Sequence, residues 1–390
     1  MLNFARQLLE RRKSKSNPFP SFRINRPLVL LQSDDWGRVG VRDKEGYELL
    51  RAAGVRLGEH PYDLYSFETA DDVSAIHELL KRHRDSTGRS ACLGMNFVMA
   101  NLDFEKMSSD GFRKLHLLPL TEGLPLHWKR PGLVDAYQAG IADAVFFPSL
   151  HGLTHFCQIA IENALAKNGP PAELLRLMWD AQTPYIYWRM PWVGYEYKNP
   201  ERPHAGFLPA KEQTALIQEA AGIFEKFFSR APVSACAPGY RSNRDTFAAW
   251  SKCGIRVAQN GTGAPLPPHM DEFEILNLHR TVDFEPSQKD LPIEKYVQLA
   301  IGCFSRGIPA IISVHSINFH SSLKDFRSPA LLALDEFLSA LETKFPNFLY
   351  INDRDAYEIV TTGKLRTARG TISVRVEREV QAPTAAGETR

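Results

Sequence analysis

The segment from Pro27 to Gly37, PLVLLQSDDWG, places the strongest constraint on the fold of this chain. A short apolar run bounded by Pro and Gly is typical of a buried strand. The run ends on Asp34 and Asp35, and parallel α/β folds place their chemistry at the carboxyl ends of strands. Because successive side chains of a strand alternate in direction, we expect one carboxylate to face a metal and the other a substrate. An isolated Asp-Asp pair is also typical of an acidic turn or a helix N-cap. A functional role for the pair therefore depends on other candidate site residues elsewhere in the sequence.

Two histidines supply the first partners. His151 and His155 follow a second strand-like run, residues 143–150. If the segment is helical, this spacing puts both imidazoles on one face, where they reach a single ion. On its own, this spacing more often arises by chance or from two surface histidines than from a metal site. One aspartate and two histidines at strand ends form the open three-ligand set of a hydrolytic zinc site, with the fourth position left for water.

Strand and helix patterns alternate along most of the chain. We predict strands at residues 90–99, 255–259, 274–278, 308–315 and 348–351, and helices at residues 210–229, 293–305, 329–344 and 353–360. Repeated strand-helix units favour a parallel sheet, and their number favours a closed or nearly closed (β/α) barrel.

An aromatic-rich insertion at about residues 156–210 interrupts this alternation. Six Tyr and Trp residues, Trp188 and Trp192 among them, fall within residues 185–197, and Pro184 and Pro191 break any helix there. Flat rings with polar tips suit a sugar-binding surface. The alternative is that these rings close one end of the core.

Composition narrows the classes of function. A chain of 390 residues with 44% hydrophobic residues can bury a large core, in one large domain or two small ones. The net charge of +2 provides no basic field for nucleic acid, and no nucleic-acid-binding motif is present. No apolar stretch is long enough to span a bilayer. We therefore expect no nucleic-acid partner, and no pattern indicates the oligomeric state.

The two ends of the chain differ from its body, which we place at residues 27–362. Residues 1–26 form a basic amphipathic segment, and residues 1–15 suit either packing on the body or a peripheral membrane contact. Residues 363–390 are polar and are predicted to be a mobile tail. Five scattered cysteines suggest free thiols in a reducing compartment. Since residues 1–20 also lack the apolar core of a signal peptide, we expect a cytoplasmic protein, with the inner membrane face as a further candidate location.

Four motifs, in this order, resemble those of the polysaccharide deacetylases (the NodB-homology family). They are Asp34-Asp35 at a strand end, His151-x-x-x-His155, the turn at Pro238, and the apolar strand that ends on His315. The resemblance spans roughly residues 27–360. It implies a distorted (β/α) barrel that holds a divalent metal, usually zinc, at its C-terminal face. Matched by position, Asp34 is the catalytic base, His315 the general acid, and Asp35, His151 and His155 the metal ligands.

Three positions depart from the family pattern. Trp36 stands between the Asp pair and Gly37. Cys236 occupies the place of an arginine that pairs with the catalytic aspartate, and we expect Arg241 to supply that charge instead. The tyrosine that follows the proline is replaced by Gly239, so the oxyanion donor is expected to be the N–H of Gly239 or of Tyr240. We expect the substrate to contact Trp36, Tyr240, Trp188 and Trp192.

These patterns predict a metal-dependent hydrolase that removes acetyl groups from a carbohydrate or glycan precursor. The metal would polarise the carbonyl and lower the pKa of bound water, while proton transfers by the base and the acid contribute about 10²- to 10⁴-fold each. Two alternatives stay open. One is a glycoside hydrolase on a related barrel, which would use two carboxylates. The other is an inactive carbohydrate-binding relative, which the changed third motif would explain.

Overall fold

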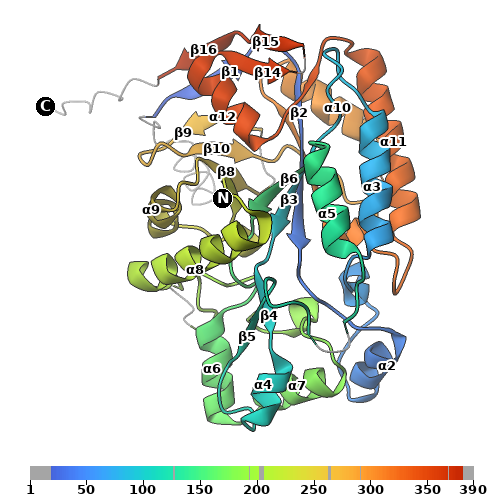
Figure 1. Ribbon diagram of the computed structural model, residues 1–390, viewed down its shortest axis with the longest axis vertical. Coiled ribbons are helices and arrows are strands. Elements are labelled where there is room, and N and C mark those ends of the chain that lie inside the picture. The colour runs from blue at the N-terminus through green and yellow to red at the C-terminus, as the bar shows by residue number, and fades with distance from the viewer. Residues whose placement is uncertain are drawn as a thin grey trace, which may run out of the picture.

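A curled, mostly parallel sheet lies at the centre of the molecule (Figure 1). The structure is a computed structural model that describes residues 19–125, 128–192, 194–201, 206–261, 265–289, 291–367 and 369–380, without the side chain of Trp188. Neighbouring strands pair in parallel along the order β11, β12, β2, β3, β6, β7, β8, β10, and β13 also pairs with β2. Their bounds are β2 Leu28–Trp36, β3 Leu93–Phe97, β6 Phe146–Leu150, β7 Ser234–Cys236, β8 Val257–Asn260, β10 Leu276–His279, β11 Val282–Asp283, β12 Ala310–His315 and β13 Leu349–Tyr350.

One continuous segment joins the two ends of this strand order. β10 pairs with β8, and β11, which follows after Arg280 and Thr281, pairs with β12. Between β10 and β11, the N–H of Arg280 donates to the carbonyl of Asn260 at 3.2 Å, and the N–H of Thr281 donates to the carbonyl of Ile311 at 2.9 Å. The sheet therefore curls into a distorted barrel, which confirms the predicted α/β class. The closing segment also carries Arg280 into the interior, where it is fully buried.

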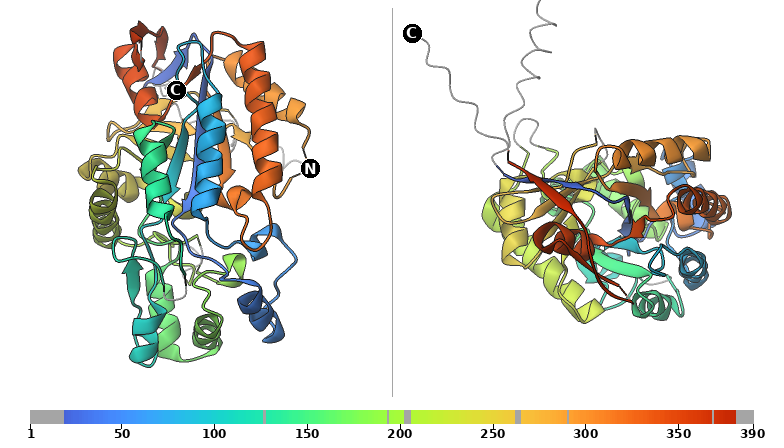
Figure 2. Two further views of the ribbon diagram at one scale, coloured as in Figure 1. Left: turned by 45° about the vertical axis from the view of Figure 1, so that its right-hand side comes forward. Right: turned by 90° about the horizontal axis from the view of Figure 1, so that it is seen from above.

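Helices cover the outside of the curled sheet (Figure 2). They are α3 Ala70–Arg82, α5 Leu133–Ala142, α8 Ala210–Phe228, α9 Arg244–Lys252, α10 Ile293–Phe304, α11 Arg327–Lys344 and α12 Asp353–Thr362. In α3 the residues Val73, Ile76 and Leu80 repeat at helical spacing and are buried. A capping box between Thr69 and Asp72 satisfies backbone donors at the start of this helix.

A second group of elements lies beyond the carboxyl ends of β2, β3 and β6, at the bottom of Figure 1. It contains α2 Lys44–Ala52, η1 Pro61–Leu64, α4 Phe104–Ser109, α6 Gln158–Lys167, α7 Pro170–Asp180, η2 Tyr187–Arg189, and the two-stranded sheet of β4 Ala100–Leu102 and β5 Leu117–Pro119. These elements share a hydrophobic cluster of their own, which includes Tyr185 and Trp192. The predicted insertion falls here, and these two rings fill a core, as the alternative interpretation held.

The end of the chain corrects the predicted mobile tail. Strands β14 Lys364–Thr367 and β15 Gly370–Ser373 form a hairpin, and β16 Val376–Glu379 pairs antiparallel with β1 Ser21–Ile24. The prediction is wrong for this stretch because backbone pairing with a strand more than 350 residues away leaves little trace in local polarity. Residues 1–18 and 381–390 lie outside the described residues, and so does the predicted membrane contact of residues 1–15.

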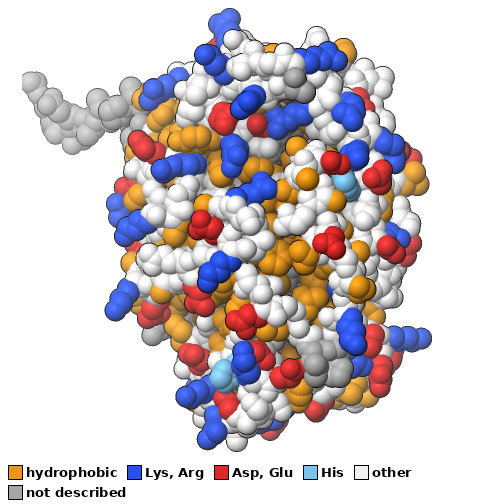
Figure 3. All heavy atoms as spheres, in the orientation of Figure 1, with side chains coloured by type: hydrophobic (Ala, Val, Ile, Leu, Met, Phe, Trp, Pro, Cys, Tyr) orange, Lys and Arg blue, Asp and Glu red, His pale blue; other side chains and the backbone are white. Residues whose placement is uncertain are grey.

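Three whole-molecule features bear on the expectations from composition. No helix in the described ranges is long and apolar enough to cross a membrane. All five cysteines are free thiols. On the face drawn in Figure 3, positive and negative side chains are interspersed, in keeping with the small net charge.

Candidate active site

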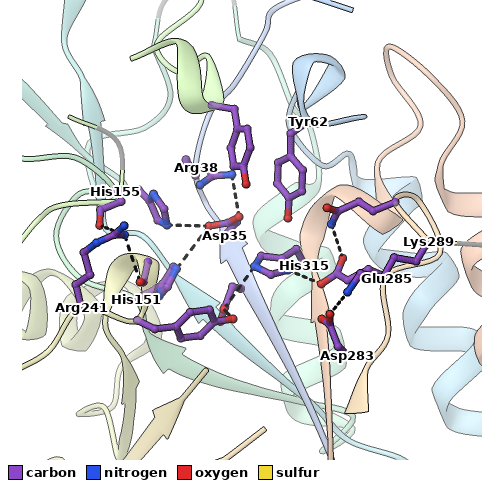
Figure 4. A pocket seen from close by; sticks show the side chains of 16 residues that line it. Asp35, Arg38, Tyr62, His151, His155, Arg241, Asp283, Glu285, Lys289 and His315 are labelled. Atoms are coloured by element: carbon purple, nitrogen blue, oxygen red, sulfur yellow. Dashed lines mark hydrogen bonds and ion pairs between the residues drawn. The ribbon is translucent and has the colours of Figure 1, made fainter. Parts of the chain in front are cut away.

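A pocket of about 330 Å³ lies at the carboxyl ends of the parallel strands (Figure 4). Its walls combine acidic, basic and aromatic side chains with one glutamine and two glycines: Asp34, Asp35, Arg38, Tyr62, His151, His155, Tyr187, Gly194, Gly239, Tyr240, Arg241, Asp283, Glu285, Gln288, Lys289 and His315. Strand order explains why these residues meet, because parallel strands present their carboxyl ends at the same edge of a sheet.

Asp35, His151 and His155 converge on one point of this pocket. The Oδ1 atom of Asp35 lies 3.5 Å from Nε2 of His151 and 3.3 Å from Nε2 of His155. Two tetrahedral ligands held about 2.0–2.1 Å from a zinc ion are about 3.4 Å apart. Oδ1 is buried and has no hydrogen-bond partner among the described residues, which is costly for a carboxylate oxygen unless a cation occupies the point it faces. The three side chains therefore fit a divalent metal.

The protonation states of these residues favour metal binding. Nδ1 of His151 lies 2.9 Å from the carbonyl of Cys236, which can only accept, so Nδ1 is the donor and Nε2 is the nitrogen directed at Asp35. Burial and the nearby Arg38 guanidinium hold the pKa of His155 well below its ordinary value, so this imidazole is neutral. Burial by itself would raise the pKa of Asp35, but the Arg38 guanidinium outweighs burial and holds this pKa below the usual range.

The backbone at Asp35 explains how adjacent aspartates serve different neighbours. Asp35 has φ +75°, in the left-handed region, and the pairing of β2 with β3 is irregular between Ser33 and Trp36. This bulge turns Asp35 toward the histidines. Its other oxygen, Oδ2, lies 2.8 Å from Nη2 of Arg38. The Arg38 guanidinium lies against the rings of Tyr65 and Tyr185, with centroids 4.2 and 3.9 Å from Cζ. Oδ1 is thereby directed at the histidines.

A loop, not a helix, brings the two histidines together, which corrects the helical expectation. Residues 151–157 precede α6, and Gly152 has φ +81°. The buried carboxylate of Glu196 accepts hydrogen bonds from the N–H groups of Leu153 and Thr154, both at 2.7 Å. A Cβ on Gly152 would lie 2.0 Å from Oε2 of Glu196, so the turn has no room for a side chain. Glu196 therefore holds the loop that carries both imidazoles.

Asp34 faces a different set of partners. Its two oxygens form a bidentate ion pair with Arg280, at 2.6 Å each, and both side chains are buried. Asn96 donates to Oδ1 at 2.6 Å and the hydroxyl of Tyr240 donates to Oδ2 at 2.9 Å. Burial opposes ionisation of Asp34, but Arg280 outweighs it and keeps the pKa well below the usual range. Asp34, His151 and Cys236 also lie close enough to hold an ion, yet the carboxylate oxygens of Asp34 are already occupied.

The predicted pairing of Arg241 with Asp34 is wrong. Nη1 of Arg241 donates to the carbonyls of Gly194 at 2.9 Å and Gly239 at 3.3 Å. Arg280, on the segment that closes the barrel, supplies the positive charge instead. Of the two predicted oxyanion donors, the N–H of Tyr240 is engaged with the carbonyl of Ala237 at 2.8 Å, which leaves that of Gly239 as the candidate.

His315 ends β12 and forms a dyad with Glu285. Its Nδ1 is hydrogen-bonded to Oε1 of Glu285, while its Nε2 lies 3.8 Å from Oδ2 of Asp34. Burial would lower the pKa of His315, but the Glu285 carboxylate raises it to about 9. The imidazole is therefore protonated at neutral pH and presents a proton beside Asp34.

The aromatic residues expected to bind substrate are only partly in the pocket. The predicted substrate contact of Trp36 is wrong, because its side chain is fully buried, donates to Ser33 Oγ and stacks on Phe319. The predicted substrate contact of Trp192 is also wrong, since its ring is buried in the hydrophobic cluster formed by the elements beyond the carboxyl ends of β2, β3 and β6. The side chain of Trp188 lies outside the described residues. Tyr240 lines the pocket and is 38% exposed.

Two further aromatics line the pocket: Tyr187 belongs to the predicted aromatic cluster, whereas Tyr62 was missed by the sequence reasoning. Tyr62 and Tyr187 stack with their ring centroids 4.3 Å apart, and both line the pocket. The Tyr62 ring also meets His315 edge-on at 5.9 Å.

Arg280, Glu285, Glu196 and Arg38 were missed as well. A faint signal exists for Arg280 and Glu285, because both are charged residues within the stretch LNLHRTVDFE, in which apolar and polar residues are mixed as in a half-buried strand. Glu196 has no local signal, since the N–H groups it binds belong to another segment. Arg38 stands only three residues after its partner Asp35, but the tyrosine rings against it come from other segments.

No family model matches this chain, and no curated protein matches its sequence significantly. Several solved structures resemble its fold. A protein assigned as a polysaccharide deacetylase from Mycobacterium smegmatis is 11% identical, with 86% of this chain and 91% of that chain covered and a TM-score of 0.46. One similarly assigned, from Pseudomonas aeruginosa PAO1, is 12% identical, with 87% and 93% covered and a TM-score of 0.46. A family 4 acetyl xylan esterase from Clostridium thermocellum, solved with a cobalt ion, is 9% identical, with 85% and 91% covered and a TM-score of 0.35. The structures that resemble this chain thus include polysaccharide deacetylases, at a likeness that assigns no activity to it.

Proposed function

We propose that the protein is a metal-dependent hydrolase that removes acyl groups, acetyl in the first instance, from a carbohydrate. One observation carries the proposal: a buried carboxylate oxygen of Asp35 faces two imidazole nitrogens at 3.3 and 3.5 Å and has no other partner among the described residues. Asp35, His151 and His155 would hold the ion. When bound, a divalent ion such as zinc polarises a carbonyl and lowers the pKa of water.

The protein's own groups would then move protons. Asp34 stays ionised because of its ion pair with Arg280, so it is always in the accepting form. Each of its oxygens already accepts at least two hydrogen bonds, and Tyr240 is the exposed donor among these partners. A proton from the pocket would therefore reach Asp34 at Oδ2, where the Tyr240 hydroxyl now lies. His315, kept protonated by Glu285, would donate to the leaving amine or alkoxide.

The same contacts weigh against both alternatives. A glycoside hydrolase needs one carboxylic acid with a raised pKa, whereas the pKa values of Asp34 and Asp35 are both lowered. The alternative of an inactive relative arose because Cys236 replaces the arginine expected to pair with Asp34. Arg280 provides that positive charge instead. The stacked rings of Tyr62 and Tyr187 beside the site support a sugar as the group that carries the acyl. We further propose a cytoplasmic location, which the five free thiols support.

The test is metal analysis of the purified protein together with acetate release from a panel of acetylated glycans. Wild type should bind one divalent ion per chain and release acetate. Asp35→Asn should lose both, because one of three protein ligands is weakened and its charge no longer offsets the cation. Asp135→Asn, the same change at an exposed position of α5, should lose neither. No bound metal, together with a Tm that excess zinc leaves unchanged, would refute the site.

A further inference from the structure

The guanidinium of Arg241 sits in a socket that is built around it. Gly194 and Gly239 have φ values of +70° and +60°, and their carbonyls both accept from Nη1. A Cβ added to Gly239 would lie 2.2 Å from Nη1, and one added to Gly194 would lie 3.1 Å from it. The ring of Tyr195 stacks on the guanidinium at 4.0 Å. These contacts hold the head group in one position at the pocket wall, as Figure 4 shows.

This placement leaves part of the guanidinium facing the pocket. An arginine has five N–H donors. The carbonyls of Gly194 and Gly239 engage Nη1, which leaves Nε and Nη2 for other acceptors. Arg241 is only partly buried, and it forms no ion pair with a described carboxylate.

Every carboxylate that lines the described part of the pocket already has a cation. Asp34 pairs with Arg280, Asp35 with Arg38, Asp283 with Lys289 and Glu285 with His315. His315 is a cation at neutral pH because Glu285 raises its pKa to about 9, against the opposing effect of burial. Among these described groups, Arg241 is the cation that has no carboxylate partner. A bound divalent ion would increase the excess positive charge of the pocket. A neutral substrate would leave that excess charge uncompensated.

We propose that the substrate is an anionic carbohydrate, whose carboxylate or phosphate group is bound by Arg241 beside the acyl group to be removed. This inference rests on the proposed function for the position of the acyl group. The fork of a guanidinium matches the paired oxygens of a carboxylate or a phosphate. His155 and Arg241 both lie against Gly194, with its Cβ position 3.9 Å from Cε1 of His155, so the anion site adjoins the metal ligands.

Binding to the metal-loaded protein tests the inference without requiring turnover. The probes are D-glucuronate and D-glucose 6-phosphate, with D-glucose as the neutral match, measured by isothermal titration calorimetry. Wild type should bind at least one anionic sugar roughly tenfold or more tightly than glucose. Arg241→Gln should abolish that preference, and Arg241→Lys should restore part of it. Arg244→Gln, which removes the same charge from an exposed arginine on α9, should keep it. Metal content is measured in every variant, because anions can also bind the ion directly.

Each outcome decides the inference. Whichever anionic sugar binds more tightly identifies carboxylate or phosphate as the favoured group. Equal affinities for all three sugars in wild type would overturn the inference, and so would a preference that survives in Arg241→Gln. Acetate release from N-acetylglucosamine and from its 6-phosphate separates this result from the proposed function. If neither is hydrolysed while the anion preference depends on Arg241, the hydrolase proposal fails and the anion site stands. If Arg241→Gln lowers kcat equally on both, Arg241 acts on the reaction itself and the inference is wrong.

Discussion

Replacing Arg280 by methionine should destabilise the protein strongly. Arg280 is fully buried, and its ion pair with Asp34 is reinforced by hydrogen bonds to Gln259 at 2.9 Å and Ser313 at 3.1 Å. Methionine fills much of the volume but leaves the Asp34 carboxylate buried without its cation. Breaking a buried pair in this way costs about 3–5 kcal/mol. At roughly 1.3 °C per kcal/mol for a chain of this length, Tm should fall by about 4–7 °C.

A double-mutant cycle with Asp34→Asn isolates the charge from the packing. The double variant removes both charges, so it should be more stable than Arg280→Met alone, by roughly 1 kcal/mol or more. Arg244→Met is the matched control, because the pair of Arg244 with Glu272 is largely exposed and should contribute less than about 1 kcal/mol. Urea unfolding followed by circular dichroism and fluorescence measures the four proteins of the cycle and the Arg244→Met control. If Arg280→Met costs no more than Arg244→Met, or the cycle is additive, the buried pair does not stabilise the barrel as argued.

Three further outcomes are expected. Glu285→Gln should lower the pKa of His315 and move the alkaline limb of kcat/KM toward lower pH by about 1–3 units; an unmoved limb would exclude His315 as the acid. Glu196→Ala should weaken metal affinity about 10- to 100-fold in a chelator competition while Glu196→Gln retains most of it, and equal affinities would refute the role in holding the loop. Burial would lower the pKa of His83, but Glu342 and Asp335 outweigh burial and raise it. The protonated imidazole therefore stabilises the folded protein fully below about pH 6.5, and this contribution is lost as pH rises through the folded-state pKa. His83→Gln should therefore destabilise more at pH 6 than at pH 9 in urea unfolding, and the opposite order would contradict this assignment.

The sequence by itself determined most of the parallel strands and which polar residues stand at their ends. β2 and β12 were predicted within two residues, because continuous apolar runs between Pro and Gly residues suit strands buried on both faces. Strand order then brings Asp34, Asp35 and His315 to one edge, since parallel strands share a carboxyl end. Helices such as α8 were predicted nearly to the residue, because their periodicity and termini are local features.

Tertiary structure alone decided which charges meet in the pocket. Asp34 and Arg280 are 246 residues apart and become neighbours only when the sheet curls until one segment closes it. Arg241 is nearer in sequence, but its guanidinium is held by the glycine carbonyls of Gly194 and Gly239 instead. Trp36 is an aromatic next to a catalytic motif, yet the bulge at Asp35 turns its ring into the core. Spacing along a chain predicts local geometry, whereas pairing of buried charges depends on long-range contacts that spacing does not encode.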